Sequence, residues 1–442
     1  MITIEQLYQL YVQHPIISTD TRKIASGSIF FALKGDKFDA NTFAAQAVEA
    51  GAAYAVVDNP DVATGDRFVL VDDVLTSLQH LAAYHRRQLQ IPVIGLTGTN
   101  GKTTTKELIN AVLSQKFNTL ATQGNLNNHI GVPLTILAIR AQHQMAVIEM
   151  GANHQKEIEF LCTIAQPSHG LITNVGKAHL EGFGGVEGVK KGKGELYDYL
   201  KKTGNTAFIN SDDQVLLKMQ TERDLENVIF YGKNINPDLL VNGKLLENSP
   251  FLTLKWCDKE SSCYNVKTNL TGAYNLDNIL AAICIGTNFG LTTDEINNGI
   301  EGYQPKNNRS QIQKTVTNTL ICDFYNANPS SMFVAIENMD KLTANRKVMI
   351  LGDMFEMGTE AAIEHTAVIR KALEANVDEC IFIGKEFSSQ QTEVQNTALI
   401  NTTFYLSAED AITGLKINPI KNATVLIKGS RGMLLERLME LF

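Results

Sequence analysis

The sequence predicts an α/β protein with three domains. Short apolar segments rich in β-branched residues alternate with segments of helical periodicity, a pattern typical of parallel sheets covered by helices. A glycine-rich loop stands between one such apolar segment and a helix, as in P-loop domains. The length of 442 residues suggests two to four domains. We therefore predict a small N-terminal α/β domain over 1–86, a central P-loop domain with a parallel sheet over 87–308, and a C-terminal Rossmann-like domain over 309–442.

Each predicted domain has its own set of elements. In the first, residues 28–33 and 54–57 read as strands and 41–50 as a helix, and a helix over 74–88 leads into the next domain. In the second, strands are expected at 91–96, 145–150, 170–175 and 205–210, with a helix at 105–114 and short antiparallel strands between about 226 and 270. In the third, strands are expected at 319–322, 347–351, 380–383 and 424–427, without a dinucleotide fingerprint.

The composition excludes several classes of protein. Hydrophobic residues make up 44% and charged residues 19%, an ordinary globular balance. The net charge of −8 argues against a general nucleic-acid binder. Six cysteines without C-x-x-C spacing indicate a reducing cytoplasm and no zinc site. The N-terminus lacks the pattern of a signal peptide, and no apolar run is long enough to span a bilayer, so we expect a cytoplasmic protein.

The loop TGTNGKTT points to phosphate. A glycine-rich turn directs backbone N–H groups at one spot, and the following helix adds the positive end of its dipole. Lys102 would reach the terminal phosphates, and the hydroxyl of Thr103 would hold Mg²⁺. The spacing departs from G-x-x-x-x-G-K-[ST], because Leu96 occupies the place of the first glycine. An ordinary turn is the alternative.

Other polar groups follow predicted strands, where ligands bind in such sheets. Glu149 ends one strand and suits Mg²⁺ beside a P-loop threonine, or is a solvated strand end. His179 lies in a glycine-rich loop, as a site residue or as a structural one. The loop 323–330, with an aspartate and two asparagines beside a proline, is a turn or a site. The loop 428–432, with two cations and backbone N–H groups, suits an anion or is a basic loop. Lys190, Lys191 and Lys193 are expected to open a helix, where cations oppose the dipole; a bound phosphate would offset them, and a solvated basic patch is the alternative.

Seven stretches, together with STDTRKIASGSIFFALKGDKFDANTF over 18–43, resemble the Mur ligases of bacterial cell-wall synthesis. The resemblance covers nearly the whole chain in the right order. The seven stretches are TGTNGKTT (97–104), GNLNNHIGVP (124–133), VIEMGANH (147–154), ITNVGKAHLEGFG (172–184), DFYNANPSSM (323–332), LGDMFEMG (351–358) and VLIKGSRGMLLE (425–436).

The resemblance implies an ATP-dependent amide ligase, in cytoplasmic peptidoglycan precursor synthesis, that joins D-alanyl-D-alanine to UDP-N-acetylmuramoyl-tripeptide. The substrate carboxylate would attack the γ-phosphate of ATP to give an acyl phosphate, which the dipeptide amine would then attack. ATP, Mg²⁺ (two ions) and a CO₂-derived carbamate on Lys193 are the implied cofactors, with unmodified lysine as the alternative. The implied partners are these small molecules, with no nucleic acid and no membrane segment, and the chain is expected to be a monomer.

The resemblance also assigns roles to single residues. Those implied for ATP are Gly98, Thr99, Asn100, Gly101, Lys102, Thr103, Thr104, Asn275, Asn278, Arg309 and Asp323. Those implied for the two substrates are Thr21, Arg22, Lys34, Asp39, Asn326, Asn328, Lys428, Ser430 and Arg431. Lys102, His179 and Lys193 would be catalytic, and Thr103, Glu149, His179 and carbamylated Lys193 would hold metal.

Three positions depart from the family pattern. Tyr274 stands where the family often has histidine, Asn308 replaces a glycine before Arg309, and Cys322 replaces the first of two aspartates. The alternatives to the ligase are a sister ligase or a folylpolyglutamate synthase-like enzyme, a P-loop protein that uses ATP as a switch, and a non-enzymatic scaffold.

Overall fold

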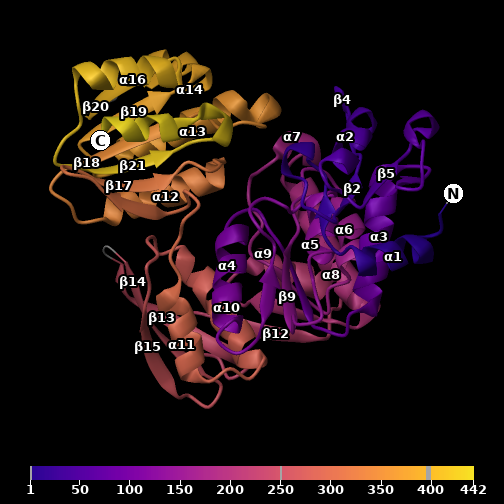
Figure 1. Cartoon of the computed structure of the whole chain (residues 1–442). Coiled ribbons are helices and arrows are strands. Elements are labelled where there is room, and N and C mark those ends of the chain that lie inside the picture. Colours follow the sequence, from indigo (N-terminus) through magenta and orange to yellow (C-terminus); the bar gives the residue numbers. More distant parts are fainter. Residues whose placement is uncertain (1, 249–250, 395–399) are drawn as a thin grey trace.

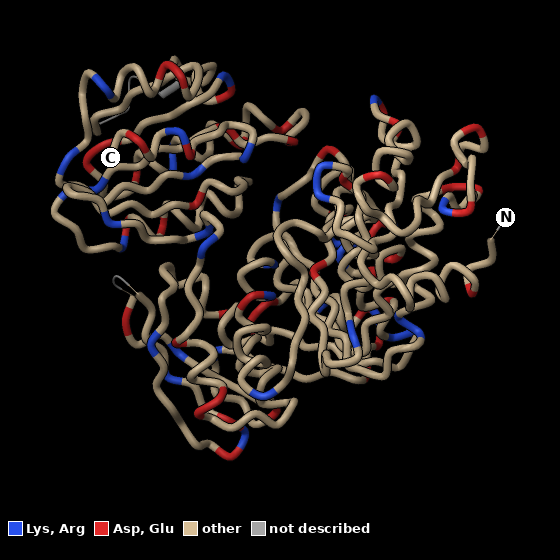
Figure 2. Tube along the Cα trace, in the orientation of Figure 1, with Lys and Arg blue, Asp and Glu red and all other residues tan. Residues whose placement is uncertain are grey.

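The computed structural model describes the backbone of residues 2–248, 251–394 and 400–442. The N-terminal domain lies at the right of the view, the C-terminal domain at the upper left, and the central domain between and below them (Figure 1). Acidic and basic residues are interspersed along the trace (Figure 2). In the described part of the chain, no helix has the length and apolar character that a membrane crossing requires.

The N-terminal domain is built on a parallel sheet of order β1-β2-β5-β6. The strands expected near 28–33 and 54–57 and the helix over 74–88 are confirmed. The helix expected over 41–50 is a 3₁₀ turn at Ala40–Phe43 followed by α2. The elements are β1 (Ile17–Ser18), β2 (Ile29–Phe31), β3 (Lys34–Gly35), β4 (Phe38–Asp39), β5 (Tyr54–Val57), β6 (Phe68–Leu70), α1 (Ile4–Gln13), α2 (Ala44–Glu49), α3 (Val74–Gln88) and 3₁₀ turns at Thr21–Lys23 and Pro60–Val62.

A sheet of order β15-β14-β13-β12-β11-β10-β7-β9-β8 forms the central domain. Its strands from β8 to β13 pair in parallel, and β13, β14 and β15 pair antiparallel, so the expected antiparallel strands extend the main sheet. The strands are β7 (Val93–Thr97), β8 (Thr119–Ala121), β9 (Met145–Glu149), β10 (His169–Ile172), β11 (Thr206–Asn210), β12 (Val228–Gly232), β13 (Leu239–Asn248), β14 (Leu252–Asp258) and β15 (Cys263–Lys267).

The helices of the central domain cover this sheet. Helix α10 is apolar on most sides because it is buried between α4 and β13. The helices are α4 (Lys102–Leu113), α5 (Gly131–Ile136), α6 (Glu157–Ala165), α7 (Leu180–Phe183), α8 (Val186–Thr203), α9 (Gln214–Glu222), α10 (Asn275–Asn288) and α11 (Thr293–Gly302).

Helix α8 corrects one expectation. It begins at Val186, after Gly185 with φ of 101°, so Lys190, Lys191 and Lys193 lie beyond its first turn. The first turn carries Glu187, which complements the helix dipole. The predicted conflict between three lysines and the dipole is therefore absent.

In the C-terminal domain the sheet order is β16-β17-β21-β18-β19-β20, parallel except for the antiparallel edge strand β16. The four strands expected there are confirmed. The elements are β16 (Gln311–Lys314), β17 (Thr319–Asp323), β18 (Lys347–Gly352), β19 (Glu379–Ile383), β20 (Asn401–Tyr405), β21 (Thr424–Lys428), α12 (Pro329–Lys341), α13 (Ala361–Glu374), α14 (Lys385–Ser389), α15 (Gln391–Val394), α16 (Ala408–Ile417) and 3₁₀ turns at Gly358–Glu360, Arg431–Met433 and Leu435–Leu441.

One cysteine pair differs from the expectation of reduced thiols. Cys257 of β14 and Cys263 of β15 face each other in register across the antiparallel pair and form a disulfide. Their proximity comes from the strand pairing, which the spacing along the chain did not indicate. The four other cysteines are buried free thiols.

Candidate active site

A cavity of about 980 Å³ lies where the central and C-terminal domains meet. The loop between β7 and α4 forms one wall, and residues that follow β9, β10 and β17 form others. These strands run parallel within their sheets, so their carboxyl ends converge on one region, where ligands bind in open α/β sheets. The cavity therefore contains the P-loop and most of the sequence-predicted ATP residues.

The P-loop needs glycine at two positions for physical reasons. Gly98 has φ of 147°, and a Cβ there would lie 2.0 Å from Oγ1 of Thr173. Gly101 has φ of 78° and precedes α4 in the left-handed region, with a side chain of Asn278 close behind it. The loop is thus packed against β10 on one side and α10 on the other.

Lys102 folds back over this loop. Its Nζ donates to the carbonyl oxygens of Gly98 at 2.7 Å and Thr99 at 3.0 Å. Burial lowers the pKa of Lys102 to about 8, with the charge of Glu149 acting in the opposite direction. A cation with only carbonyl partners in a desolvated place is suited to an anionic ligand.

Glu149 and Thr103 provide oxygen donors for a cation. Thr103 Oγ1 donates to Oε1 of Glu149 at 3.3 Å, and Asn127 Nδ2 donates to the same oxygen at 2.9 Å. Oε2 of Glu149 is buried and has no hydrogen-bond partner in the described chain. An orphaned carboxylate oxygen beside a P-loop threonine fits Mg²⁺, which is held by one or two carboxylates together with phosphates.

This donor set is small. The described residues contain no group of three or more His, Cys, Asp and Glu side chains placed to hold a metal ion. Nucleotide sites commonly hold Mg²⁺ with one or two carboxylates together with waters and phosphates.

Lys193 lies behind the cavity wall. Its side chain is almost fully buried, and its Nζ donates to the carbonyl of Ala152 at 3.2 Å and lies 5.1 Å from the centre of the Phe183 ring. Burial, with a smaller contribution from Lys102, lowers its pKa to about 7. A substantial fraction of such an amine is neutral near pH 7 and hence nucleophilic.

His179 connects the central domain with the C-terminal one. It lies just before α7 with φ of 51° and lines the main cavity. Its Nδ1 pairs with a carboxylate oxygen of Glu356, a C-terminal residue. Burial lowers the pKa of His179, and the Glu356 carboxylate opposes this shift.

The two asparagines expected near adenine join α10 to the P-loop helix. Asn275 Nδ2 donates to the carbonyl of Thr271 at 2.7 Å, and its Oδ1 accepts from Asn278 at 2.9 Å. Oδ1 of Asn278 accepts from the hydroxyl of Thr105 in α4 at 3.0 Å. Both asparagines line the cavity.

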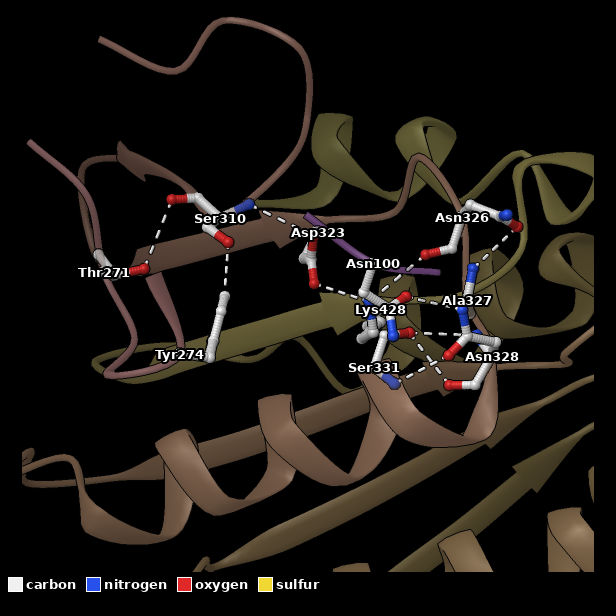
Figure 3. A network of polar contacts seen from close by, with 10 residues as sticks. All are labelled: Asn100, Thr271, Tyr274, Ser310, Asp323, Asn326, Ala327, Asn328, Ser331 and Lys428. Atoms are coloured by element: carbon white, nitrogen blue, oxygen red, sulfur yellow. Dashed lines mark hydrogen bonds and ion pairs between the residues drawn. The ribbon is translucent and has the colours of Figure 1, made fainter. Parts of the chain in front are cut away.

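A polar network runs from α10 into the C-terminal domain (Figure 3). The hydroxyl of Tyr274 lies 2.5 Å from Oγ of Ser310, and the Ser310 N–H donates to Oδ1 of Asp323 at 3.3 Å. Lys428 is buried and donates from Nζ to Oδ2 of Asp323 at 2.7 Å. Tyr274, one of the departures, therefore anchors the start of the C-terminal domain.

The same network reaches the P-loop (Figure 3). Asn328 caps α12, because its Oδ1 accepts from the Ser331 N–H at 2.9 Å. Its Nδ2 donates to Oδ1 of Asn100 at 2.8 Å. Most of the hydrogen-bonding capacity of Asn328 is used in this way, whereas Asn326 lines both described cavities.

Two arginines flank one aromatic ring. The guanidinium carbons of Arg309 and Arg431 lie 3.8 and 5.1 Å from the ring centre of Tyr325. Nε of Arg309 is buried without a partner among the described residues, and Arg309 lines the main cavity. Ser430 accepts at Oγ from the N–H of Phe355 at 3.0 Å and so holds the loop after β18.

The residues expected to serve UDP lie in the N-terminal domain, in the segments that follow β1 and β2. Thr21 lies in the turn after β1, where Arg22 pairs with Asp20 at 2.8 Å. Lys34 pairs with Asp58 at 2.7 Å. Asp39 accepts from the N–H and the side chain of Asn41, which gives it a capping role. None of the four lines the main cavity.

Sequence reasoning missed several residues of the site. Asn127, Tyr325 and Glu356 all lie in stretches that carried the family resemblance, but their partners are distant along the chain. Glu364 and Lys177 also pair across the domain boundary, at 2.6 Å. The signal for each of these is a contact in space, which a single sequence does not contain.

Three domains, a P-loop and a carboxylate-lined nucleotide cavity closed by a Rossmann-like domain define the class of P-loop-dependent ligases. The chain belongs to the Mur ligase family. Its three matched regions are described as Mur ligase family, catalytic domain (15–95), Mur ligase middle domain (96–286), and Mur ligase, glutamate ligase domain (308–431).

Individual relatives agree over most of the chain. The UDP-N-acetylmuramoyl-tripeptide--D-alanyl-D-alanine ligase of Escherichia coli K12 is 36% identical, covering 96% of this chain and 92% of its own length. The Bacillus subtilis 168 protein of the same name is 33% identical, and the match covers 98% of this chain and 94% of the relative. A structure of MurF from Acinetobacter baumannii superposes with a TM-score of 0.85 at 31% identity, covering 96% and 92%. The structure of MurF ligase from Thermotoga maritima in complex with ADP superposes with a TM-score of 0.82 at 26% identity. The match covers 97% of this chain and 96% of that one.

Proposed function

We propose that this chain is an ATP-dependent amide ligase that adds D-alanyl-D-alanine to UDP-N-acetylmuramoyl-tripeptide in peptidoglycan precursor synthesis. The observation that carries the proposal is the pairing of the P-loop with Glu149, whose Oε1 accepts from the hydroxyl of the loop threonine Thr103 while its buried Oε2 has no partner among the described residues. Relatives that bear this activity in their names match the chain from end to end.

The first half-reaction is phosphoryl transfer from ATP to the tripeptide carboxylate. The carboxylate attacks the γ-phosphorus, the bond to the β,γ-bridging oxygen breaks, and ADP leaves an acyl phosphate behind. We assign Gly98–Thr104 to hold the phosphates, with Lys102 neutralising charge on the transferred group. Mg²⁺ held by Thr103 and Glu149 would supply further charge neutralisation. Asn275, Asn278, Arg309 and Asp323 would contact the nucleoside side.

The second half-reaction needs the dipeptide amine beside the acyl phosphate. A cavity of about 200 Å³ adjoins the main one and is lined by His179, Asn326, Glu356 and Arg431. We assign it to D-alanyl-D-alanine, with the Arg431 cation facing the dipeptide carboxylate. The amine attacks the carbonyl carbon, phosphate leaves, and an amide forms. Closure of this space would keep water from the acyl phosphate.

Lys193 is proposed to carry a carbamate. Its lowered pKa leaves a neutral amine that can attack CO₂, and the product would be an anion close to Lys102 and His179. That charge would suit a second Mg²⁺ shared with His179. A carbamate resonance in the ¹³C spectrum of the protein equilibrated with labelled bicarbonate would test this, with Lys193→Met as the blank.

The remaining residues are assigned by where they lie in the fold. We place Thr21, Arg22, Lys34 and Asp39 on the UDP side, within a substrate domain of residues 1–86, followed by an ATP domain of 87–308 and a ligase domain of 309–442. Lys428 and Ser430 would serve the substrate side through the loops they hold. We also propose that the chain acts in the cytoplasm as a monomer.

The test is a coupled assay of phosphate release with ATP, Mg²⁺ and UDP-N-acetylmuramoyl-tripeptide, with and without D-alanyl-D-alanine. We expect phosphate and the pentapeptide product, detected by mass, only with both substrates. Release that ignores both substrates would indicate a nucleotide switch. Turnover with another amine but not with the dipeptide would move the chain to a sister ligase.

A further inference from the structure

An ion pair outside both cavities joins the central domain to the C-terminal domain. Nζ of Lys177 lies 2.6 Å from Oε1 of Glu364. Lys177 precedes α7 in the central domain, and Glu364 lies in the first turn of α13. Neither residue lines the main cavity or the smaller one. The pair is therefore separable from the groups that would touch the substrates.

The environment of Glu364 makes this pair unequal. Its side chain is 5% exposed, whereas that of Lys177 is 49% exposed. Lys177 is the one hydrogen-bond partner of the Glu364 carboxylate within the described ranges 2–248, 251–394 and 400–442. A buried carboxylate is costly without a cation, so it favours the domain arrangement in which the lysine reaches it.

The segment around Lys177 contacts the C-terminal domain at further points. The backbone N–H of Lys177 donates to Oγ of Ser330 at 3.0 Å. A Cβ on Gly176 would lie 2.8 Å from the same hydroxyl, so the two domains approach closely here. Two residues further on, His179 pairs with Glu356 and lines both cavities. Fixing Lys177 thus fixes the segment that joins the nucleotide cavity to the smaller cavity.

We propose that Lys177 and Glu364 are positioning residues that hold the C-terminal domain in the closed arrangement needed for attack by the dipeptide amine. The proposal rests on the ligase function above. ATP can bind the P-loop of the central domain without the pair, but the dipeptide cavity contains residues of both domains. Loss of the pair therefore lowers kcat/KM for D-alanyl-D-alanine more than it weakens nucleotide binding.

The test is charge reversal in the full-length enzyme. Lys177→Glu and Glu364→Lys are each expected to lower kcat/KM for the dipeptide about tenfold, in keeping with a half-exposed pair. The double variant restores most of it, because the pair re-forms with opposite signs. ADP affinity changes less than about twofold. Lys371→Met, which removes the 3.1 Å pair with Glu337 inside the C-terminal domain, is the matched control and leaves kcat/KM near that of the wild type.

A second readout does not depend on the assigned reaction. Small-angle scattering with a non-hydrolysable ATP analogue is expected to give a larger radius of gyration for Lys177→Glu than for the wild type, and a restored value for the double variant. Additive losses in the double variant, or unchanged kinetics and size in Lys177→Glu, would overturn the proposal. If the wild type shows no dipeptide-dependent turnover, the proposed function fails. The scattering then still tests whether Lys177 and Glu364 hold the two domains together. Glu364→Gln, of the same shape, serves where the lysine variant does not fold; it removes the charge without adding repulsion, so a smaller loss of kcat/KM for the dipeptide is expected, and no loss would overturn the proposal.

Discussion

At the scale of single residues, Lys102 is the side chain whose loss should separate chemistry from folding. Among the described residues its Nζ bonds only to the two loop carbonyls of Gly98 and Thr99, and burial lowers its pKa to about 8, so its charge is not stabilised by the fold. We expect Lys102→Ala to lower kcat at least about 10²-fold, since charge on the transferred phosphoryl group loses its donor. The unfolding midpoint should change little.

Lys106, one turn further along α4, provides the control. It is almost fully buried, and its Nζ donates to the carbonyl of Thr122 at 2.6 Å. Lys106→Ala should cost about 2 kcal/mol of unfolding free energy, because a buried carbonyl loses a charged donor. Rates from phosphate release and midpoints from urea unfolding measure both effects. Substantial turnover in Lys102→Ala would contradict the role of the loop.

The sequence was informative about residues whose partners are local. Gly98, Gly101 and Lys102 could be predicted because strand, loop and helix follow one another along eight residues of chain. Thr103 was expected beside Glu149, but the second partner, Asn127, was not, since it reaches the carboxylate from another strand connection. Asn328 was expected on the substrate side, and its bonds to Ser331 and Asn100 support a capping and domain-joining role in addition.

At the scale of elements, glycine can permit a tight turn or the close packing of two helices, and the sequence alone did not separate these two roles. Gly188 and Gly192 lie inside α8, where glycine is unfavourable for a helix taken alone. A Cβ at Gly188 would lie 1.8 Å from the carbonyl oxygen of Phe183, and one at Gly192 would lie 2.4 Å from its ring. These glycines permit close packing of α7 on α8, a tertiary reason. The helix over 74–88 was predictable to the residue because its signals, the Asp73 cap and a regular apolar face, are local.

Helix α3 also carries a pH-sensitive contact with α1. His85 is buried, its Nε2 donates to the carbonyl of Ile139 at 3.1 Å, and Tyr8 lies 3.3 Å from Nδ1. Burial, together with Arg140 and Arg86, lowers the pKa of His85. A lowered folded-state pKa means that the unfolded chain binds the proton more tightly. The stability is therefore present above the unfolded pKa of about 6.5 and is lost as pH falls below it.

The variant His85→Gln tests this contact. Glutamine can keep a donor and an acceptor but does not titrate. We therefore expect the free energy of unfolding to fall by about 1 kcal/mol near pH 7.5, and the difference from the wild type to be smaller at pH 5.5. Urea unfolding at the two pH values measures it. His80→Gln, exposed on the same helix, is the control. If the difference in unfolding free energy between the wild type and His85→Gln is the same at both pH values, the expectation is contradicted.

At the scale of the whole molecule, the local patterns of the sequence predicted the order of the domains but not their convergence. Local patterns predicted the class of each sheet. They did not show that residues after β10 and β17 line one cavity, because that depends on contacts between domains such as Asn328 to Asn100. The resemblance to a family supplied the expectation of a shared cleft.

The same contacts predict a molecule that closes on its ligands. The described links across the boundary include the 2.8 Å bond between Asn328 and Asn100 and the half-exposed pair of Lys177 with Glu364. Polar links of this kind contribute about 1 kcal/mol each, since water replaces them on opening. Open and closed arrangements should therefore be close in free energy. Ligands that touch both domains then favour closure by their differential affinity.

Small-angle scattering of the wild type measures this directly. We expect the radius of gyration to fall when a non-hydrolysable ATP analogue and UDP-N-acetylmuramoyl-tripeptide are both present, and to fall less with the analogue alone. In the proposed assignment, the analogue would take most of its contacts from the central domain, with Arg309 and Asp323 as its C-terminal ones, whereas the tripeptide substrate would add contacts with the residues after β17. Asn328→Ala should lessen the compaction, because the P-loop then loses its link to α12. An equal radius with and without both ligands would mean that the domains are fixed, and that the acyl phosphate is shielded from water without domain motion.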